Sequence, residues 1–374
     1  MLRAEIVHPS ELAPAEITAW SALQSDAPEL GSPLLGPGFA LAVGEVRPDA
    51  RIAIWRDGRR ASGFLGFHRV AGGFARPIGA PFSDYQALVS GPRFPEADEA
   101  LQAAGLNGMR LTGLIDPHQV FPRDLQPALA HRIDLAAGGE AYLASLWASS
   151  GNRWRNYKRY SRRLADQIGP LSVRALDASA ATFEALFAWK RRQLAGTGLH
   201  DFTSARWIQQ LMRRLFEARG EAFGGLLVSL YAGDRPVAAH FGVRQDGWYH
   251  PWIGAYDPDL AAYSPGLVHQ ALAAAAAAKI GIRTYDLGPR AGRSKRMFAN
   301  AAAEVREGVA IGASLPAALL VRSEQLLSHG LLGRARKRWD HVAAVEPTVS
   351  GRLAGIAQAA GALNRRAAAW SKAA

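Results

Sequence analysis

The sequence predicts a mixed α/β (α+β) fold built from two tandem domains, and three observations carry that prediction. Strand-like and helix-like runs alternate along the whole chain, which favours sheets flanked by helices. A strand–turn–strand pattern around Asp57-Gly58 recurs around Gly233, and self-similarity across half a chain indicates a duplicated domain. The length of 374 residues suits two ordinary domains. We therefore expect domains over 1–150 and 151–312, each with a mixed central sheet, and a helical basic tail over 313–374.

In the first half, residues 51–67 predict a β-hairpin that turns at Asp57-Gly58. Such a turn needs left-handed backbone conformations, which Asp and Gly accept. Short helices are expected over 15–23 and 97–104, where apolar residues recur between polar ones.

The second half repeats this organisation. A hairpin is expected over 226–241, and helices over 181–196 and 204–219. A basic helix over about 152–167 joins the halves and ends at Gly169-Pro170.

The most informative stretch is Tyr263-Ser264-Pro265-Gly266, which opens an alanine-rich helix after a strand-like run over 248–254. Ser264 suits the N-cap, and Pro265 suits the first helical position, where no amide hydrogen is needed. Gly266 would let a ligand approach the backbone closely. Such a helix start presents amide hydrogens and the positive end of the helix dipole to an anion. A well-capped helix without a ligand is the alternative interpretation.

Four titratable residues near this helix are candidates for chemistry. Lys295 could neutralise a phosphate or a developing oxyanion, and Asp286 could act as a base or orient Lys295. His240 and His250 lie on neighbouring predicted strands, and histidine suits proton abstraction near neutral pH. The alternatives are a solvated lysine, a turn-capping aspartate and hydrogen-bonded structural histidines. No spacing indicates a metal site, so we expect no metal.

The net charge of +12 is concentrated in two places. Residues 153–163 carry six basic side chains and no acid, and residues 322–374 carry nine basic and three acidic ones. Within the first, Arg155, Arg159 and Arg162 share one side of a helix, with Lys158 adjacent. Six cations without an acid repel one another unless an anion binds. Of the interleaved aromatics, we expect burial for Tyr157 and Tyr160, and list Trp154 with Arg155 and Lys158 as substrate-binding candidates.

Other features bear on the compartment. The chain has no cysteine, which fits a reducing environment, and no run approaches the roughly 20 apolar residues of a membrane span. Residues 1–6 lack the apolar run of a signal peptide. We expect a cytoplasmic protein. In the tail, a leucine-rich stretch precedes the cluster over 334–339, which would suit peripheral contact with an anionic inner-membrane face or an anionic nucleotide.

The order of these motifs resembles a known group of enzymes. The hairpin, the Trp189-Lys190-Arg191-Arg192-Gln193 helix, the Ser264-Pro265-Gly266 helix start and the Asp286…Lys295 segment occur as in bacterial GNAT-type acyltransferases of cellulose and exopolysaccharide biosynthesis, relatives of the FemAB aminoacyltransferases. The segment over 77–85 is similar to the first domain of that group. Two features depart from it: the usual acyl-CoA signature is replaced by Ser264-Pro265-Gly266, and Ser294 precedes Lys295.

The resemblance implies two GNAT-like domains, of which the second binds acetyl-CoA or another acyl-CoA. The expected acceptor is an amino or hydroxyl group of a sugar or lipid-linked glycan precursor. We expect direct transfer within a ternary complex, since no good covalent nucleophile is visible in the sequence. Within this interpretation, the candidate donor site is Tyr263 to Gly266, the candidate catalytic residues are Lys295, Asp286 and His240, and the candidate substrate-binding residues include Lys190, His250 and Trp252. Two alternatives remain: FemAB-like aminoacyl transfer from tRNA, the one case in which nucleic acid would bind, and a non-catalytic module for anionic nucleotides.

Overall fold

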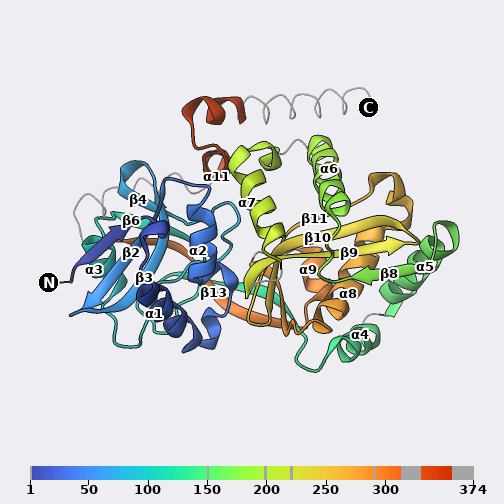
Figure 1. The fold of residues 1–374 in the computed structure, drawn as a ribbon, viewed down its shortest axis with the longest axis horizontal. Helices are drawn as coiled ribbons and strands as arrows, with labels where there is room; N and C mark the ends of the chain where they lie inside the picture. The colour runs from blue at the N-terminus through green and yellow to red at the C-terminus, as the bar shows by residue number, and fades with distance from the viewer. Residues whose placement is uncertain are drawn as a thin grey trace. The chain divides into compact units, whose positions relative to one another are not determined.

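The computed structural model describes residues 2–149, 151–197, 200–219, 222–289, 292–312 and 330–355 (Figure 1). The chain forms two compact units, and each draws on several parts of the sequence. Unit 1 comprises 1–131, 288–291 and 302–341; unit 2 comprises 132–287, 292–301 and 342–374.

Unit 1 is a mixed sheet with helices. Its strands are ordered β1-β2-β3-β4-β6-β13, and β5 pairs with β3. The strands are β1 (Ala4–Val7), β2 (Ala50–Asp57), β3 (Arg60–Arg69), β4 (Phe74–Pro77), β5 (Val89–Ser90), β6 (Gly108–Leu114) and β13 (Ala301–Ile311); the helices are α1 (Pro14–Ser25), α2 (Pro37–Gly44) and α3 (Ala97–Ala103).

Unit 2 has the strand order β12-β11-β10-β9-β8. These strands are β8 (Leu171–Arg174), β9 (Phe223–Ala232), β10 (Arg235–Gln245), β11 (Trp248–Tyr256) and β12 (Thr284–Pro289). The helices are α4 (Gly139–Ala148), α5 (Gly151–Gln167), α6 (Ala180–Thr197), α7 (Arg206–Glu217), α8 (Pro265–Ala278) and α9 (Arg293–Phe298). Strand β7 (Gln126–Asp134) begins in unit 1 and ends in unit 2.

Both units repeat one topology, which confirms the predicted duplication. In unit 1, the antiparallel strands β2, β3 and β4 are followed by α3 and by β6, which pairs with β4 in parallel. In unit 2, β9, β10 and β11 are antiparallel and are followed by α8 and by β12, which pairs with β11 in parallel. The two hairpin turns contain Gly58 and Gly233, both at φ +59°, a left-handed conformation that glycine adopts without strain.

Helices cover both faces of the unit 2 sheet (Figure 1). On one face Phe183 of α6 stacks on Phe216 of α7, with 4.4 Å between ring centroids, and Phe241 of β10 packs edge-on against Phe183. On the other face α8 packs with α4 and α5 over a core that includes Leu164 and Val268, both fully buried. This burial supplies the main driving force for unit 2 to fold.

The helices predicted from sequence are confirmed within a few residues. The basic helix is α5, and Trp154 and Tyr157 on its inner face are each only 6% exposed, while Tyr160 is half-buried. The tail contains α11 (Gly330–Val345), but residues 313–329 and 356–374 lie outside the described part of the chain. In the described residues, no helix combines the length and apolar character that crossing a bilayer requires.

In unit 1 the chain itself fills the space beyond the short β4–β6 pairing. These strands pair at Phe74↔Gly108 and Ala75↔Met109, and Gln86 then forms a parallel bridge with Leu114. The Gln86 side-chain oxygen accepts hydrogen bonds from the Thr112 and Gly113 amides, at 2.8 and 3.1 Å. A Cβ on Gly113 would lie 2.3 Å from the Asp84 carbonyl oxygen, so the segment is pressed against β6.

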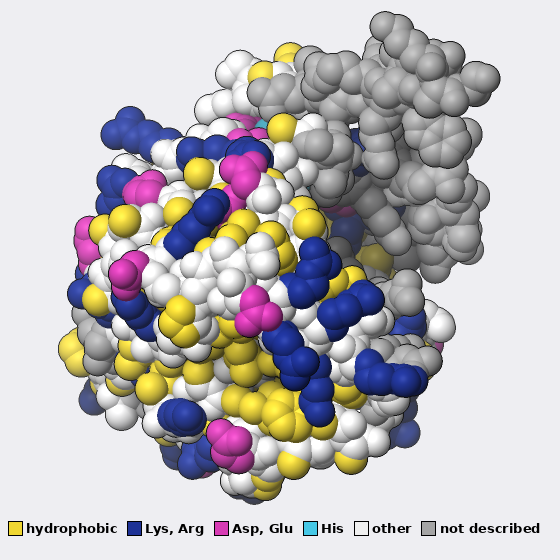
Figure 2. Space-filling view, turned by 90° about the vertical axis from the view of Figure 1, so that its right-hand side faces the viewer, with side chains coloured by type: hydrophobic (Ala, Val, Ile, Leu, Met, Phe, Trp, Pro, Cys, Tyr) yellow, Lys and Arg dark blue, Asp and Glu magenta, His cyan; other side chains and the backbone are white. Residues whose placement is uncertain are grey.

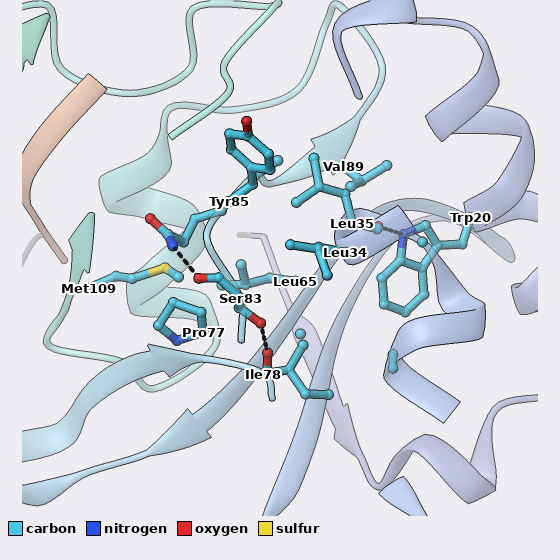
Figure 3. A pocket seen from close by; sticks show the side chains of 15 residues that line it. Trp20, Leu34, Leu35, Leu65, Pro77, Ile78, Ser83, Tyr85, Val89 and Met109 are labelled. Atoms are coloured by element: carbon cyan, nitrogen blue, oxygen red, sulfur yellow. Dashed lines mark hydrogen bonds between the residues drawn. The ribbon is translucent and has the colours of Figure 1, made fainter. Parts of the chain in front are cut away.

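Figure 3 shows the pocket that remains beside this segment. Apolar side chains such as Trp20, Leu34 and Met109 line it, and its polar groups are already paired: Ser83 donates its hydroxyl to the Ile78 carbonyl, and the Trp20 indole donates to the Leu35 carbonyl at 2.9 Å. This pocket therefore presents no set of titratable side chains to a ligand.

Candidate active site

In unit 2 the corresponding strands separate. Strands β11 and β12 pair only at their starts, at Trp248↔Thr284 and Tyr249↔Tyr285, although both continue. Opposite this point the β10–β11 register skips one residue, because Phe241 pairs with Ile253 and Gly242 with Pro251. Trp252 is thus the extra residue of a β-bulge, a device that re-aims side chains and is frequent beside active sites. We call the region where β11 and β12 no longer pair the β11–β12 opening.

A buried carboxylate lies at the start of the opening. Asp286 is fully buried; its Oδ1 lies 3.7 Å from His250 Nδ1 and its Oδ2 lies 3.6 Å from Arg132 Nε. Arg132 also stacks over the Trp248 ring, with its guanidinium carbon 4.6 Å from the ring centroid. A carboxylate without exposure needs a cationic neighbour such as Arg132, because desolvating a lone charge is costly. Asp286 sits within strand β12 and not in a turn, so the turn-capping alternative is wrong.

The opposite face of the same strands carries an imidazole–phenol pair. Neighbouring residues of a strand point to opposite faces, so Tyr285 and Asp286 mark the two faces of β12. His240 Nδ1 lies 2.7 Å from the Tyr285 hydroxyl, and the His240 ring meets the His269 ring of α8 edge-on at 4.4 Å. His269 Nε2 lies 2.9 Å from the Val228 carbonyl oxygen, which fixes that nitrogen as the donor.

Electrostatics keep His240 uncharged. Burial, together with the nearby Lys190 ammonium, lowers the pKa of His240 to about 4. Burial also lowers the pKa of His269 well below its ordinary value, and it raises that of Tyr285. At neutral pH His240 and Tyr285 are therefore both uncharged and share a hydrogen bond. The neutral imidazole can accept a proton without first being deprotonated.

Lys190 and Gly254 complete this side of the opening. The Lys190 ammonium on α6 lies 3.4 Å from the Gly254 carbonyl oxygen and 3.2 Å from the Gln193 amide oxygen. Burial lowers the pKa of Lys190. Gly254 pairs with His240 across β10 and β11, and a Cβ on Gly254 would lie 2.7 Å from His240 Cδ2. Only glycine leaves the imidazole in its place.

The α8 start lies at the end of β11 and the 3₁₀ turn over Pro258–Tyr263. Pro265 is the first helical residue, as predicted. Ser264 occupies the N-cap but adopts a left-handed conformation (φ 48°) with no side-chain cap, so the predicted Ser264 capping bond is wrong. A serine N-cap normally has extended backbone, from which its hydroxyl reaches the amides of the first helical turn. With its positive φ, Ser264 cannot place its hydroxyl there. Gly266 lies against the Tyr256 ring, and the Arg163 guanidinium of α5 lies 5.5 Å from the Tyr263 ring centroid.

The remaining predicted residues lie as follows. Lys295 is half-buried in α9, a helix in which Arg296 is exposed; Arg290 lies outside the described residues. Arg155 and Lys158 are exposed on α5, whereas Trp154 on the same helix is buried against Tyr157 in the core. Its ring therefore offers little surface for stacking on a substrate. Among the described residues no group of three or more His, Cys, Asp or Glu side chains could share a metal ion.

Sequence reasoning did not identify Arg132, Gly254, His269 or Tyr285 as members of this cluster. Arg132 and His269 carry no local signal, because β7 and the α8 interior meet the opening only through the fold. Gly254 ends the strand-like run over 248–254 and Tyr285 directly precedes Asp286, so their spacing to His250 and Asp286 is the available clue.

Comparison with known proteins identifies the second unit. Residues 151–296 match the family model for an acetyltransferase (GNAT) domain. Over these residues the chain is similar to GNAT acetyltransferase domains. The matched residues include β8 to β12, the α8 start and Lys295, so the β11–β12 opening lies in the part of the chain with this similarity, and the protein is an acyltransferase.

Among solved structures, the likeness to FemX supports the fold. The crystal structure of FemX is 13% identical, with a TM-score of 0.52 over 87% of this chain and 100% of FemX. The C-terminal domain (DUF2156) of a proposed lysylphosphatidylglycerol synthetase from Agrobacterium fabrum is 11% identical, with a TM-score of 0.47 over 83% of this chain and 95% of that domain. A tandem GNAT protein from the clavulanic acid biosynthesis pathway is 11% identical, with a TM-score of 0.42 over 83% of this chain and 97% of that protein. None of the curated proteins matches the sequence.

Proposed function

We propose that the GNAT domain transfers an acyl group, most simply acetyl, from acyl-CoA to an amino or hydroxyl group of a sugar. The acceptor would belong to an exopolysaccharide, capsule or adhesive-matrix precursor. The observation that carries the proposal is the β11–β12 opening, which has titratable groups on both faces and ends beside the α8 start.

In this proposal the donor's phosphates bind at the α8 start, Ser264-Pro265-Gly266, with Tyr263 beside them. Pro265 has no amide hydrogen and the Ser264 amide donates to the Ala261 carbonyl, so Gly266 supplies the amide hydrogen among these three residues. A helix start favours an anion through its free amide hydrogens and its dipole. Arg163, next to Tyr263, adds a cation at the same end of the helix. The acyl group would then point along β11 into the opening.

The chemistry requires a polarised carbonyl and an acceptor for one proton. The uncharged His240, held by the Tyr285 hydroxyl, is our candidate for the proton acceptor, with His250 and Asp286 on the other face of the strands. Lys190 and Lys295 are the candidate cations for developing negative charge. The chain has no cysteine, so we propose direct transfer without a thioester on the enzyme.

The acceptor class rests on the motif resemblance and on the aromatic side chains of β11. Trp252 at the bulge and Tyr256, which is 36% exposed, lie along the strand that borders the opening. Aromatic faces of this kind suit the apolar faces of sugar rings.

A thiol-release assay tests the donor. Because the chain contains no cysteine, free CoA thiol can be followed with a thiol reagent without any protein background. We expect CoA release from acetyl-CoA or a longer acyl-CoA that depends on an added amino sugar or hydroxyl sugar. Calorimetry with acetyl-CoA, CoA and desulfo-CoA would give the donor affinity. Absence of both CoA binding and CoA release would exclude the proposal.

Aminoacyl transfer is the second candidate, and the fold likeness to FemX favours it. The discriminating experiment supplies aminoacyl-tRNA and acyl-CoA separately to the same acceptor mixture. Consumption of aminoacyl-tRNA alone would establish the alternative and refute an acyl-CoA donor.

A further inference from the structure

One surface of unit 2 lies apart from the candidate active site and carries an unusual combination of side chains. On α5 the inner residues Trp154, Tyr157 and Leu164 are buried, and the outer residues Arg155, Lys158, Arg159 and Arg162 are exposed. These four cations recur at intervals of three and four residues, so they form a stripe along one side of the helix. Figure 2 looks onto this side of the molecule, where Lys and Arg side chains gather.

An exposed tryptophan borders the stripe. Trp147, near the end of α4, is 44% exposed, and the Lys158 ammonium lies 5.8 Å from its ring centroid. Leaving this much indole in water is unfavourable, and the residue is not needed for the core, which α4 reaches through Tyr142, Leu143 and Leu146. We define the α4–α5 surface as Trp147, Arg155, Lys158, Arg159 and Arg162.

We propose that the α4–α5 surface docks on an anionic phospholipid membrane. An indole with a polar edge is stable at the headgroup level of a bilayer, and cations next to it attract the negative lipid surface. At about 1 kcal/mol for each cation near the surface, the stripe gives binding that is useful but reversible and sensitive to salt.

The burial pattern favours lipid over RNA. Surfaces that bind single-stranded nucleic acid interleave cations with exposed aromatic faces on which bases stack. Here Trp154 and Tyr157 are buried, and the exposed Trp147 already holds a cation near its ring. A straight stripe with one indole at its edge matches a flat charged surface better than a stacking platform.

This inference does not depend on the proposed acyl transfer, because docking is measured without donor or acceptor. It differs from the docking through residues 334–339 that the sequence alone predicted. In that cluster Arg336 lies 3.8 Å from Asp340 across one helical turn and is half-buried, so its charge is partly neutralised.

Vesicle flotation of the full chain tests the proposal. We expect binding to vesicles with 40% phosphatidylglycerol, loss of binding in 0.5 M NaCl, and no binding to pure phosphatidylcholine. The variant Arg155→Glu/Lys158→Glu/Arg162→Glu should lower the bound fraction at least tenfold, and Trp147→Ser should lower it severalfold. The matched control is Arg59→Glu/Arg60→Glu/Arg93→Glu, which makes the same change of charge at three exposed arginines of unit 1 and should bind as the unaltered protein does.

Each other outcome would overturn the proposal. The first is that the unaltered protein does not bind vesicles. The second is that both triple variants lose vesicle binding to the same extent. The third is that deleting residues 356–374 abolishes vesicle binding while the triple variant of α5 still binds. A fourth outcome is that the unaltered protein binds tRNA but not vesicles, and that the triple variant of α5 no longer binds tRNA. Circular dichroism and thermal unfolding of both triple variants confirm that they are folded.

Discussion

His240 depends on the absence of a side chain at Gly254. A Cβ on Gly254 would lie only 2.7 Å from Cδ2 of the imidazole, and the ring is held in this position by the Tyr285 hydroxyl. If His240 accepts the proton in transfer, a methyl group at residue 254 should disturb catalysis through the displacement of this ring alone.

We predict that Gly254→Ala lowers turnover at least tenfold and the free energy of unfolding by about 1–3 kcal/mol, the usual cost of overpacking. In a His240→Ala background the same substitution should have little further effect, because the clash is gone. Turnover and thermal unfolding of both single variants and the double variant complete the cycle. Additive losses would mean that Gly254 matters for a reason other than His240.

Lys295 gives a second test at this scale. We expect Lys295→Ala to leave the melting temperature near that of the unaltered protein and to lower turnover at least tenfold, about 1.4 kcal/mol of barrier, because a neutralising charge is lost in the transition state. Lys279→Ala, at an exposed lysine at the end of α8, is the control. Equal turnover in the two variants would show that Lys295 is a structural or solvated lysine without a role in the reaction.

At the scale of the elements, the two units share one topology but differ beside the parallel strand pair, which is β11–β12 in unit 2 and β4–β6 in unit 1. In unit 2 the parallel pairing of β11 and β12 stops after two residue pairs, while in unit 1 the residues around Gln86 continue beside β6 beyond the corresponding pairs.

We predict that Gly266→Val lowers donor affinity at least tenfold with a small change in melting temperature. The added Cβ would lie 3.0 Å from Tyr256 Cδ1, but that ring is 36% exposed and can move outward. Calorimetry with the donor measures the effect. Gly91→Val is the control, since the nearest atom to its Cβ lies 3.9 Å away. Unchanged affinity in a folded Gly266→Val protein would locate the donor elsewhere.

In unit 1, Gln86→Leu should lower the free energy of unfolding by about 2–5 kcal/mol, because it leaves the Thr112 and Gly113 amides without their acceptor. Donor affinity should not change. Gln102→Leu, at an exposed position of α3, is the control for denaturant unfolding. A loss of donor affinity in Gln86→Leu would show that unit 1 takes part in donor binding.

Much of this organisation was readable in the sequence, and the reasons are physical. The hairpins followed from turns that require glycine, and α8 from Pro265 and its alanine-rich interior. The filled opening in unit 1 was not readable, because Gln86 acts through side-chain bonds to strand amides distant in sequence. The Arg132–Asp286 contact also joins residues that are distant in sequence, so the sequence does not predict it. The basic pattern of α5 likewise does not indicate that the exposed Trp147 of α4 lies beside it.

At the scale of the whole molecule, burial keeps three histidines of the described residues neutral in the folded protein. Burial lowers the pKa of His68 in unit 1 and of His240 and His269 in unit 2. The unfolded chain binds more protons at these positions than the folded one below pH 6.5, so folding loses stability as the pH falls below that value.

We therefore predict that the melting temperature falls steadily from pH 6.5 to pH 4, before the carboxylates titrate. His240→Gln should reduce the slope by about one proton, which is about 1.4 kcal/mol per pH unit. His118→Gln, at a half-buried turn residue, is the control. A pH profile that His240→Gln leaves unchanged would contradict the neutral state of His240.

The last strand of unit 1 has a consequence for biosynthesis. β13 is the antiparallel partner of β6, yet it is encoded after most of unit 2. A ribosome that has finished residue 131 must add about 180 more residues before β13 emerges, which takes roughly ten to forty seconds at ordinary elongation rates. During that interval the nascent chain carries β6 without its partner, and an unpaired strand edge invites association with other chains. Unit 1 is thus translated first, but its sheet is completed only after β13 has been made. A chaperone that shields the growing chain would act on β6.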